Sequence, residues 1–252
     1  VVALSPVVKP GEAKARLVLS SGVEVELGYT NGDTIREKGF PILNGKEYID
    51  YSKQENTLQG DVVYNELIVP PGGEYRLVLA DRTVVYMNSE SRLKYPVMFG
   101  GKNRMVELEG EAYFEVRKDV GRPFIVHSGG QKVTVLGTSF GITCYASEVN
   151  DYTTLVSGKV NVEFGQGNQS FVLEPGMQVA YSKGTGETEY KKVDTHLFTS
   201  WKDGYYEFEE MELGELMPLL GRWYAVGVDF EEPELKRLKF SGRLQRYETV
   251  AD

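Results

Sequence analysis

Residues 75–87, which spell YRLVLADRTVVYM, decide the fold class of this 252-residue chain. Apolar and polar side chains alternate on both sides of the polar turn ADR, and a period of two is typical of β strands with one buried face. Closely spaced strands with short connections predict a sandwich, barrel or solenoid-like wrap of antiparallel sheets. Similar segments, separated by turns rich in Gly, Pro and Asn, lie at 15–27, 104–108, 112–116, 124–127, 132–136, 140–145, 154–164 and 171–181.

One short pattern occurs twice. The letters RLVL at Arg16–Leu19 return at Arg76–Leu79, and each copy is followed by a polar turn and a further alternating segment. We therefore predict that the chain uses the same hairpin twice. Residues 30–60 lack strong periodicity and are predicted to form loops with one or two short strands.

The character of the sequence changes near residues 185–200, where we place a domain boundary. Residues 1–195 are predicted to form the large all-β domain, with 1–65 as its irregular lead-in strands, and 196–252 a small α+β domain. Strands at 205–208 and 225–230 would flank one helix as a β-α-β unit, and Pro218 would kink or shorten that helix. The helix is predicted from apolar residues at steps of three and four, which are Leu213, Leu216, Met217, Leu220 and Tyr224.

The composition limits the partners. Lys plus Arg number 28 against 37 Asp plus Glu, which gives a net charge of −9. A phosphate backbone would be repelled by this surface, so nucleic acid is not expected as a partner. No run of apolar residues approaches the length needed to span a bilayer.

Catalytic and metal-binding patterns are absent from the sequence, so neither a cofactor nor a metal is expected. His127 and His196 stand far apart, with no paired ligand spacing and no cysteine partner. Cys144 is the single cysteine and has no basic neighbour that would lower the pKa of its thiol. The closely spaced histidines of a cupin barrel are missing, and the Gly-rich turns lead into strands rather than into helices.

One pair of acidic residues is a candidate for catalysis. Glu109 and Glu111 flank Gly110, and paired carboxylates are what glycoside hydrolysis uses. Residues two apart on a strand lie too close together to straddle a sugar, unless Gly110 breaks the strand with a bulge. The structural interpretation, in which one carboxylate bonds to turn amides or pairs with Arg104 or Arg122, is favoured.

Nine motifs follow one another in order along the chain. They are 72–96 (GGEYRLVLADRTVVYMNSESRLKYP), 104–116 (RMVELEGEAYFEV), 122–128 (RPFIVHS), 133–145 (VTVLGTSFGITCY), 153–162 (TTLVSGKVNV), 173–181 (LEPGMQVAY), 201–208 (WKDGYYEF), 222–230 (RWYAVGVDF) and 240–248 (FSGRLQRYE). This ordered set resembles the FecR-like family of anti-sigma factors, in the form common in Bacteroidetes. The resemblance extends from residue 66 to the end of the chain, and Arg82, Gly141 and Pro218 depart from the family's pattern. Arg82 replaces a usual glycine, so its turn either avoids positive φ or is strained.

The resemblance implies a single-pass inner-membrane protein, of which this chain is the periplasmic part. Val1–Leu4 would be the tail of the membrane helix, and 247–252 the start of a truncated helix. The implied partners are the signalling domain of a TonB-dependent outer-membrane transporter and, through a missing cytoplasmic region, a sigma factor. The membrane is reached only through a missing N-terminal helix, and the implied function is a signal relay by protein contact, without enzymatic activity.

The C-terminal domain is the predicted contact surface, because open sheet edges suit strand addition. Trp223, Tyr224, Phe240 and Gly242 are the candidate partner-binding residues, and core and contact roles are equally open for Trp223 and Tyr224. In strand-like contexts large aromatics more often fill a core, which is the expectation for Trp201, Phe230 and Phe240.

Two other function classes stay open at this point. A glycan-binding or glycan-processing β-sandwich would use the abundant aromatics and the pair Glu109 and Glu111. A stalk-like structural module of the cell envelope is the third possibility.

Overall fold

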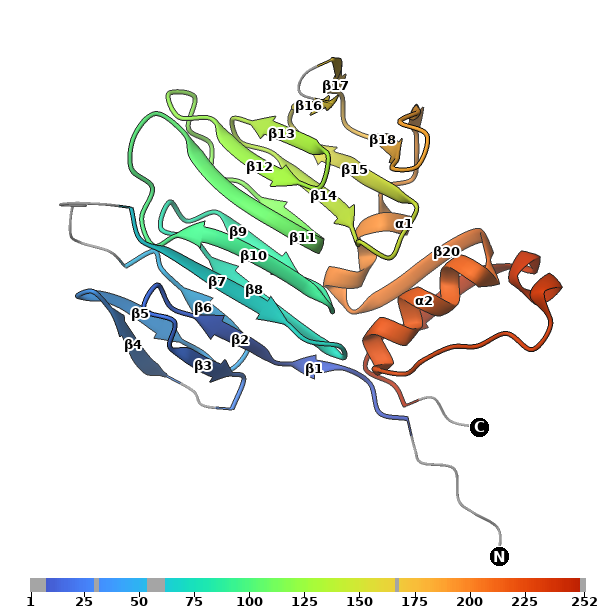
Figure 1. Cartoon of the computed structure of the whole chain (residues 1–252), viewed down its shortest axis with the longest axis horizontal. Helices are drawn as coiled ribbons and strands as arrows, with labels where there is room; N and C mark the ends of the chain where they lie inside the picture. Colours follow the sequence, from blue (N-terminus) through green and yellow to red (C-terminus); the bar gives the residue numbers. More distant parts are fainter. Residues whose placement is uncertain (1–7, 30–31, 54–61, 166–167, 250–252) are drawn as a thin grey trace, which may run out of the picture.

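The computed structural model describes residues 8–29, 32–53, 62–165 and 168–249. Nineteen strands form one continuous hydrogen-bonded network, which folds over into two sheets that we call together the β sandwich (Figure 1). In spatial order the first sheet contains β3 (Glu24–Leu27), β2 (Ala15–Val18), β7 (Tyr64–Val69), β10 (Ser91–Pro96), the first half of β11 (Arg104–Glu115), β12 (Phe124–Ser128), β13 (Gln131–Val135), β16 (Val160–Phe164) and β17 (Gln169–Leu173).

The second sheet is built in the same way, and most neighbouring strands are antiparallel. Its order is β4 (Asp33–Glu37), β5 (Phe40–Asn44), β6 (Tyr48–Asp50), β8 (Gly73–Val78), β9 (Val84–Met87), the second half of β11, β14 (Ser139–Cys144), β15 (Asn150–Ser157), β18 (Met177–Ser182) and β19 (Thr188–Lys192). The short β1 (Glu12–Ala13) pairs in parallel with β8.

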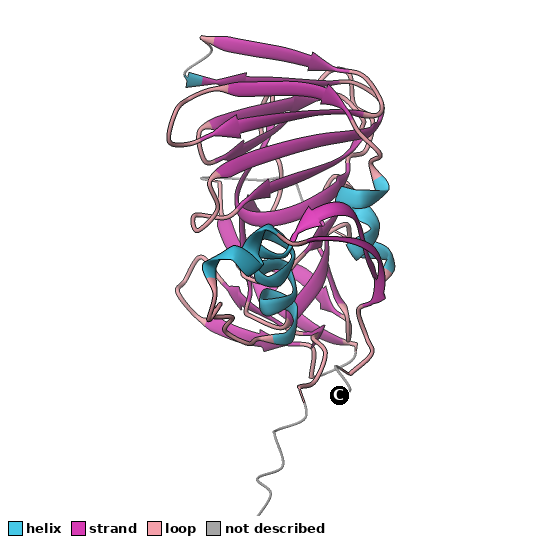
Figure 2. Ribbon diagram, turned by 90° about the vertical axis from the view of Figure 1, so that its right-hand side faces the viewer, coloured by secondary structure: helices cyan, strands magenta, loops and turns pink. Residues whose placement is uncertain are grey.

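Successive hairpins alternate between the two sheets. The hairpin of β12 and β13 belongs to the first sheet, that of β14 and β15 to the second, and that of β16 and β17 again to the first. Figure 2 shows the resulting stack of strands in side view. The prediction of a mainly β protein is therefore confirmed, and the arrangement combines a sandwich with a solenoid-like wrap.

Strand β11 joins the two sheets at Gly110. Residues before it pair with β10 and β12, and residues after it pair with β9 and β14. Gly110 has φ of 91°, a conformation that favours glycine. The strand folds over at this point, so that Arg104 at its start donates a hydrogen bond of 2.8 Å to the carbonyl oxygen of Arg117 just beyond its end.

One apolar core fills the space between the sheets. Alternate residues of β13 and β16 are buried, as the period of two predicts. Phe114 on β11 stacks on Phe140 of β14 at 5.1 Å between ring centroids, and Phe124 of the first sheet lies 6.2 Å from Phe114. The contact of Phe114 with Phe124 crosses between the sheets and holds the sandwich together, since burying an aromatic side chain contributes on the order of 2 kcal/mol.

The last elements form a separate layer against one end of the sandwich, and we call residues 196–249 the C-terminal unit. Two antiparallel strands, β20 and β21, pair with each other, and helix α2 connects them together with a 3₁₀ turn (Figures 1 and 2). The elements are α1 (His196–Thr199), η2 (Ser200–Asp203), β20 (Tyr205–Glu212), α2 (Leu213–Tyr224), η3 (Pro233–Arg237) and β21 (Lys239–Gln245).

Three local predictions differ from the structure. Residues 225–230 form no strand, and the second strand of the unit is β21. The described part of 30–60 holds three strands, β4 to β6, rather than one or two. Pro218 lies inside α2, which nevertheless runs continuously for 12 residues. Tertiary packing overrides local preference at these positions.

Two further sequence expectations concern the termini and the membrane. The suggested helix tail Val1–Leu4 lies outside the described residues, and residues 246–248 form turns rather than a helix. Within the described ranges, the helices lack the length and apolar character required to cross a bilayer.

Candidate functional site

The C-terminal unit holds all four predicted contact residues, but it places them differently. Trp223 is fully buried, in a cluster with Trp201, Tyr206 and Tyr113. Tyr224 is half-buried, and its hydroxyl donates to the carbonyl oxygen of Glu248 at 3.1 Å. Of the two roles left open for Trp223, the structure gives it the core role, so a partner cannot contact this side chain directly.

Phe240 and Gly242 lie on β21, whose residues are all exposed. Phe240 is 43% exposed, which makes the expectation of a core role for this residue wrong. Trp201, by contrast, is buried as expected, and Phe230 is half-buried. Of the predicted contact residues, Phe240 and Gly242 are therefore the two that a partner can reach.

An apolar stripe runs along β21. Phe240, Gly242 and Leu244 alternate and therefore share one face of the strand, and Leu238 directly precedes it. Their large side chains are 43–49% exposed, and Tyr247 beyond the strand is 57% exposed. Among the described strands, β21 pairs only with β20, so its second edge is open to a further strand.

Arg246 follows this stripe and ties the C-terminal unit to the sandwich. Its side chain is fully buried, with the guanidinium carbon 3.7 Å from the ring centroid of Trp223. It donates to the side-chain oxygen of Asn88 at 2.9 Å and pairs with Glu74 at 2.9 Å, both from the sandwich. A further hydrogen bond of 2.6 Å reaches the carbonyl oxygen of Trp201. One cation thus joins both parts of the protein.

Arg222 makes a second attachment. Its backbone oxygen accepts a hydrogen bond of 2.7 Å from the amide of Gly72, in the turn between β7 and β8. Its guanidinium lies 3.9 Å from the ring centroid of Tyr145 and pairs with Glu148. The helix α2 is therefore fixed on the sandwich at two points, by Arg222 and by Trp223.

The chain's N-terminal segment lies against the same helix. A side chain at Gly11 would come within 2.6 Å of the Trp223 ring, so only a glycine fits there. β1 follows immediately and lies beside one end of α2 (Figure 1). A movement of α2 would therefore change the contact between Trp223 and the N-terminal segment.

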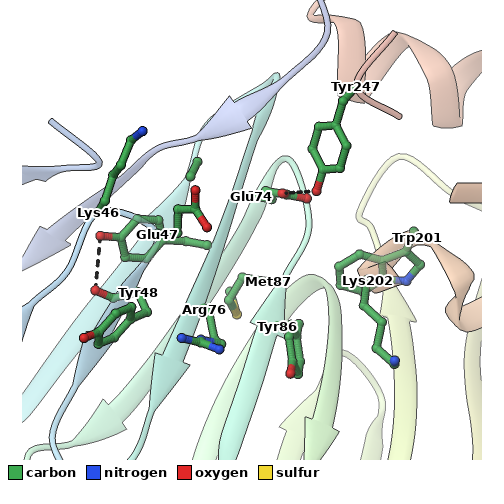
Figure 3. Close-up of a pocket in the computed structure, with 12 residues that line it drawn as sticks. Lys46, Glu47, Tyr48, Glu74, Arg76, Tyr86, Met87, Trp201, Lys202 and Tyr247 are labelled. Atoms are coloured by element: carbon green, nitrogen blue, oxygen red, sulfur yellow. Dashed lines mark hydrogen bonds between the residues drawn. The ribbon is translucent and has the colours of Figure 1, made fainter. Parts of the chain in front are cut away.

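A groove of about 370 Å³ lies where the C-terminal unit meets the sandwich (Figure 3). Tyr48, Tyr86 and Tyr247 line it, together with the carboxylates of Glu47 and Glu74. Aromatics and two carboxylates in one groove are what a glycan site would need. Glu74, however, accepts a hydrogen bond of 2.7 Å from Tyr247 and pairs with Arg246, so it is committed to the interface.

The acidic pair weighed as catalytic is split by the fold of β11. Glu109 is exposed on the first-sheet half, and Glu111 on the second-sheet half accepts hydrogen bonds from Asn88 and Thr143. Burial raises the pKa of Glu111 above its ordinary value, and the hydrogen bond from Asn88 partly opposes this. Glu111 therefore has the structural role that the sequence favours, but it bonds to Asn88 and Thr143 and not to the expected arginines. Arg104 pairs with Asp81 and Arg122 with Asp119.

The other chemical candidates lack a reactive setting. Burial raises the pKa of the Cys144 thiol to about 12, so the thiolate is scarce at neutral pH. His127 is half-buried on β12, and His196 is exposed at the start of α1. Over the described residues, no group of three or more His, Cys, Asp or Glu side chains is placed to hold a metal ion.

Three comparisons relate this chain to known proteins. The family model described as FecR protein matches residues 65–161, and the model described as FecR, C-terminal, matches residues 205–252. Two crystal structures of a candidate anti-sigma factor from Parabacteroides distasonis ATCC 8503 are similar, each with 29% sequence identity over 73% of this chain. The matches cover 85% and 86% of the two solved chains, with TM-scores of 0.67 and 0.65. No curated protein matches the sequence.

Proposed function

We propose that this chain receives its signal on β21. The two family matches together span more than half of the chain, so it belongs to the FecR family of anti-sigma factors. The family is regulatory rather than enzymatic. The proposed partner is the signalling domain of a TonB-dependent outer-membrane transporter. The proposed output is a change in a sigma factor, which is held by a cytoplasmic region outside this chain.

The exposed stripe of β21 carries this proposal. Apolar side chains at the surface are ordinary when scattered, but contiguous ones mark interaction sites. Here Phe240 and Leu244 lie on one face of β21, and the exposed Leu238 directly precedes the strand. An open strand edge beside them offers main-chain hydrogen bonds, which give affinity, while the apolar side chains give selectivity.

The route from this surface to the rest of the protein also supports a relay. β21 leads directly into Arg246, which contacts Trp223 and the sandwich residues Asn88 and Glu74. Trp223 in turn lies against Gly11 of the N-terminal segment. In a periplasmic protein with its membrane helix before Val1, which is our proposal for the location, this segment would connect the contact surface to the membrane.

Binding of the chain to the isolated signalling domain of the transporter encoded beside it, measured by calorimetry, tests the proposal. We expect micromolar or tighter binding that weakens by about tenfold or more in the variant Phe240→Ala/Leu244→Ala, as hot-spot truncations do. The control variant Val23→Ala/Val149→Ala removes two exposed apolar side chains from the sandwich and should leave affinity unchanged. Trp223 is unsuitable as a probe, because truncating a buried tryptophan costs about 3–5 kcal/mol of stability.

Three outcomes would contradict the proposal in different ways. Absence of binding removes the transporter as partner. Equal weakening by both variants removes β21 as the contact surface. If the Phe240→Ala/Leu244→Ala variant of the full-length protein loses stability but keeps its affinity, the stripe is an internal packing surface and not a contact site.

A further inference from the structure

A second concave surface, of about 620 Å³, lies between the turn that joins β8 to β9 and the connection from β11 to β12. We call it the basic pocket. Five cationic side chains line it, four from these two connections and one, Arg104, from the start of β11; the four are Arg82, Arg117, Lys118 and Arg122. This concentration stands out in a chain whose net charge is −9.

Only two of these cations are neutralised. Asp81 pairs with Arg104 at 2.7 Å, and Asp119 pairs with Arg122 at 2.8 Å. These are the two carboxylates of the pocket lining. Arg82, Arg117 and Lys118 form no ion pair with any of the described residues, and all three are exposed. The pocket therefore presents a local excess of positive charge.

Arg104 forms the floor of the pocket and arranges its rim. The side chain is fully buried, and it donates to the carbonyl oxygens of Arg122 and Arg117, each at 2.8 Å. These bonds fix both ends of the connection that carries Arg117, Lys118 and Arg122. The Nη2 atom of Arg104 is buried and has no hydrogen-bond partner within the described part of the chain. Because the protein encloses this atom, the basic pocket offers a ligand its exposed cations and not this donor.

Arg82 holds a conformation that its residue type disfavours. Its φ is 70°, in the left-handed region. The chain itself shows what suits this position, because the hairpin turn at Leu19–Val23 has the same backbone hydrogen bonds and places Gly22 there, with φ of 83°. The turn at Leu79–Thr83 thus carries an arginine where a glycine fits better. Strain of this kind gathers at functional sites.

The basic pocket lies at the opposite end of the sandwich from the C-terminal unit. The turn before β8 contains Gly72, which bonds to Arg222 of α2, whereas the turn after β8 carries Arg82. The length of β8 (Gly73–Val78) separates the two sites. A ligand of the basic pocket would therefore not compete with a partner on β21.

We propose that the basic pocket binds an acidic peptide segment of a partner protein. Three features favour a peptide over a small anion: the pocket is open, its free cations are exposed, and Val120 on the rim is 70% exposed. A small-molecule site would instead enclose its ligand with mostly apolar walls. Carboxylates along an extended segment reach several separate cations at once, and the segment's aliphatic stems contact Val120.

The experiment is fluorescence anisotropy with a labelled synthetic peptide of alternating Glu and Gly, against a Gln and Gly analogue. The chain should bind the acidic peptide at low salt and lose about tenfold or more in affinity when the ionic strength rises severalfold, as exposed charges are screened. Arg82→Gly should weaken binding about threefold or more while the variant folds fully, because glycine suits the backbone there. Adding Arg117→Gln and Lys118→Gln should weaken it by about tenfold in total.

A charge-matched control separates a site from a general effect. The variant Lys9→Gln/Lys192→Gln/Lys239→Gln removes three exposed cations elsewhere and should keep affinity within about twofold. Equal weakening in both triple variants would overturn the proposal. So would binding of inorganic pyrophosphate or of anionic lipid vesicles without binding of the peptide, because each identifies another ligand class. The readout is independent of the transporter, so this proposal and that for β21 can fail separately.

Discussion

Trp223 and Arg246 lie face to face in the interior of the protein, with 3.7 Å between the guanidinium carbon and the indole centroid. Both side chains are fully buried, and the Trp223 indole N–H donates to the Arg246 carbonyl oxygen. A desolvated cation over an aromatic face contributes about 2 kcal/mol, and the hydrogen bonds to Asn88 and Trp201 add to it. The C-terminal unit is therefore fixed to the sandwich.

Replacing Arg246 should loosen this attachment. Arg246→Ala removes the ion pair with the partly exposed Glu74, the hydrogen bond to the Asn88 side-chain oxygen and the contact with the Trp223 ring, which together should cost about 3 kcal/mol. We expect a loss of that size in the free energy of unfolding, measured with urea. Trypsin should also cut faster after Lys191 and Lys192, directly before the connection, because the C-terminal unit detaches first.

Arg243→Ala is the matched control. Arg243 lies on the same strand, pairs with Glu207 at 3.2 Å and stacks on Tyr205, but its side chain is 56% exposed. An exposed pair contributes about 1 kcal/mol or less, so this variant should stay close to the wild type. If both variants lost the same stability, the burial of Arg246 would not be what holds the unit.

The alternating segments of the sequence predicted the strands well because the period of two follows directly from burying one face of a sheet. The repeated RLVL pattern was also informative: both copies form hairpins with the same turn hydrogen bonds. Residues 225–230 failed as a strand, since apolar alternation over a few residues does not distinguish a strand from an extended connection.

The attachment of the C-terminal unit could not be predicted from the sequence. Arg246 contacts Glu74 and Asn88, which lie more than 150 residues earlier, and no local pattern marks such a pairing. Trp223 was recognised as important, but contact and core roles have the same sequence signature. Only the packing against Gly11 and Arg246 separates them. The basic pocket was missed for the same reason, because its cations come from segments that lie apart in the sequence.

Gly110→Ala should destabilise the protein strongly. The residue has φ of 91°, and an added Cβ would lie 2.8 Å from both the carbonyl oxygen of Glu90 and the Cα of Ser91. Backbone strain and the clash together should cost about 2–4 kcal/mol. Gly22→Ala isolates the strain, because Gly22 has φ of 83° with open space around it, and about 1 kcal/mol is expected there. Equal losses in chemical denaturation would show that the fold-over of β11 tolerates a side chain.

Arg82→Gly should stabilise the protein by about 0.5–1 kcal/mol. The gain is the relief of the left-handed conformation, reduced by the greater freedom of glycine in the unfolded chain. The reciprocal change Gly22→Arg, in the equivalent turn, should cost about 1 kcal/mol. Thermal unfolding of both variants measures this. A loss of stability in Arg82→Gly would mean that the arginine side chain makes a favourable contact that outweighs its strain.

Glu111→Gln should raise stability at neutral pH and do so less at acid pH. Burial raises the pKa of Glu111, so the folded protein holds this proton at pH values where the unfolded chain has released it. The contribution of Glu111 to the free energy of unfolding therefore falls as the pH rises from the ordinary glutamate pKa, about 4.3, to the raised pKa of the folded state. Above that pH the contribution stays level.

The amide of Glu111→Gln can accept from Asn88 through its oxygen and donate to the Thr143 hydroxyl oxygen through its NH2, without carrying a charge. We therefore expect a gain in the free energy of unfolding at pH 7, because glutamine carries no charge to desolvate. The gain should shrink toward pH 4 in urea denaturation. Glu109→Gln, at the exposed position two residues away, should change stability by less than about 0.5 kcal/mol at any pH. If Glu111→Gln is less stable at neutral pH, the attraction of Glu111 to Arg222 outweighs its burial.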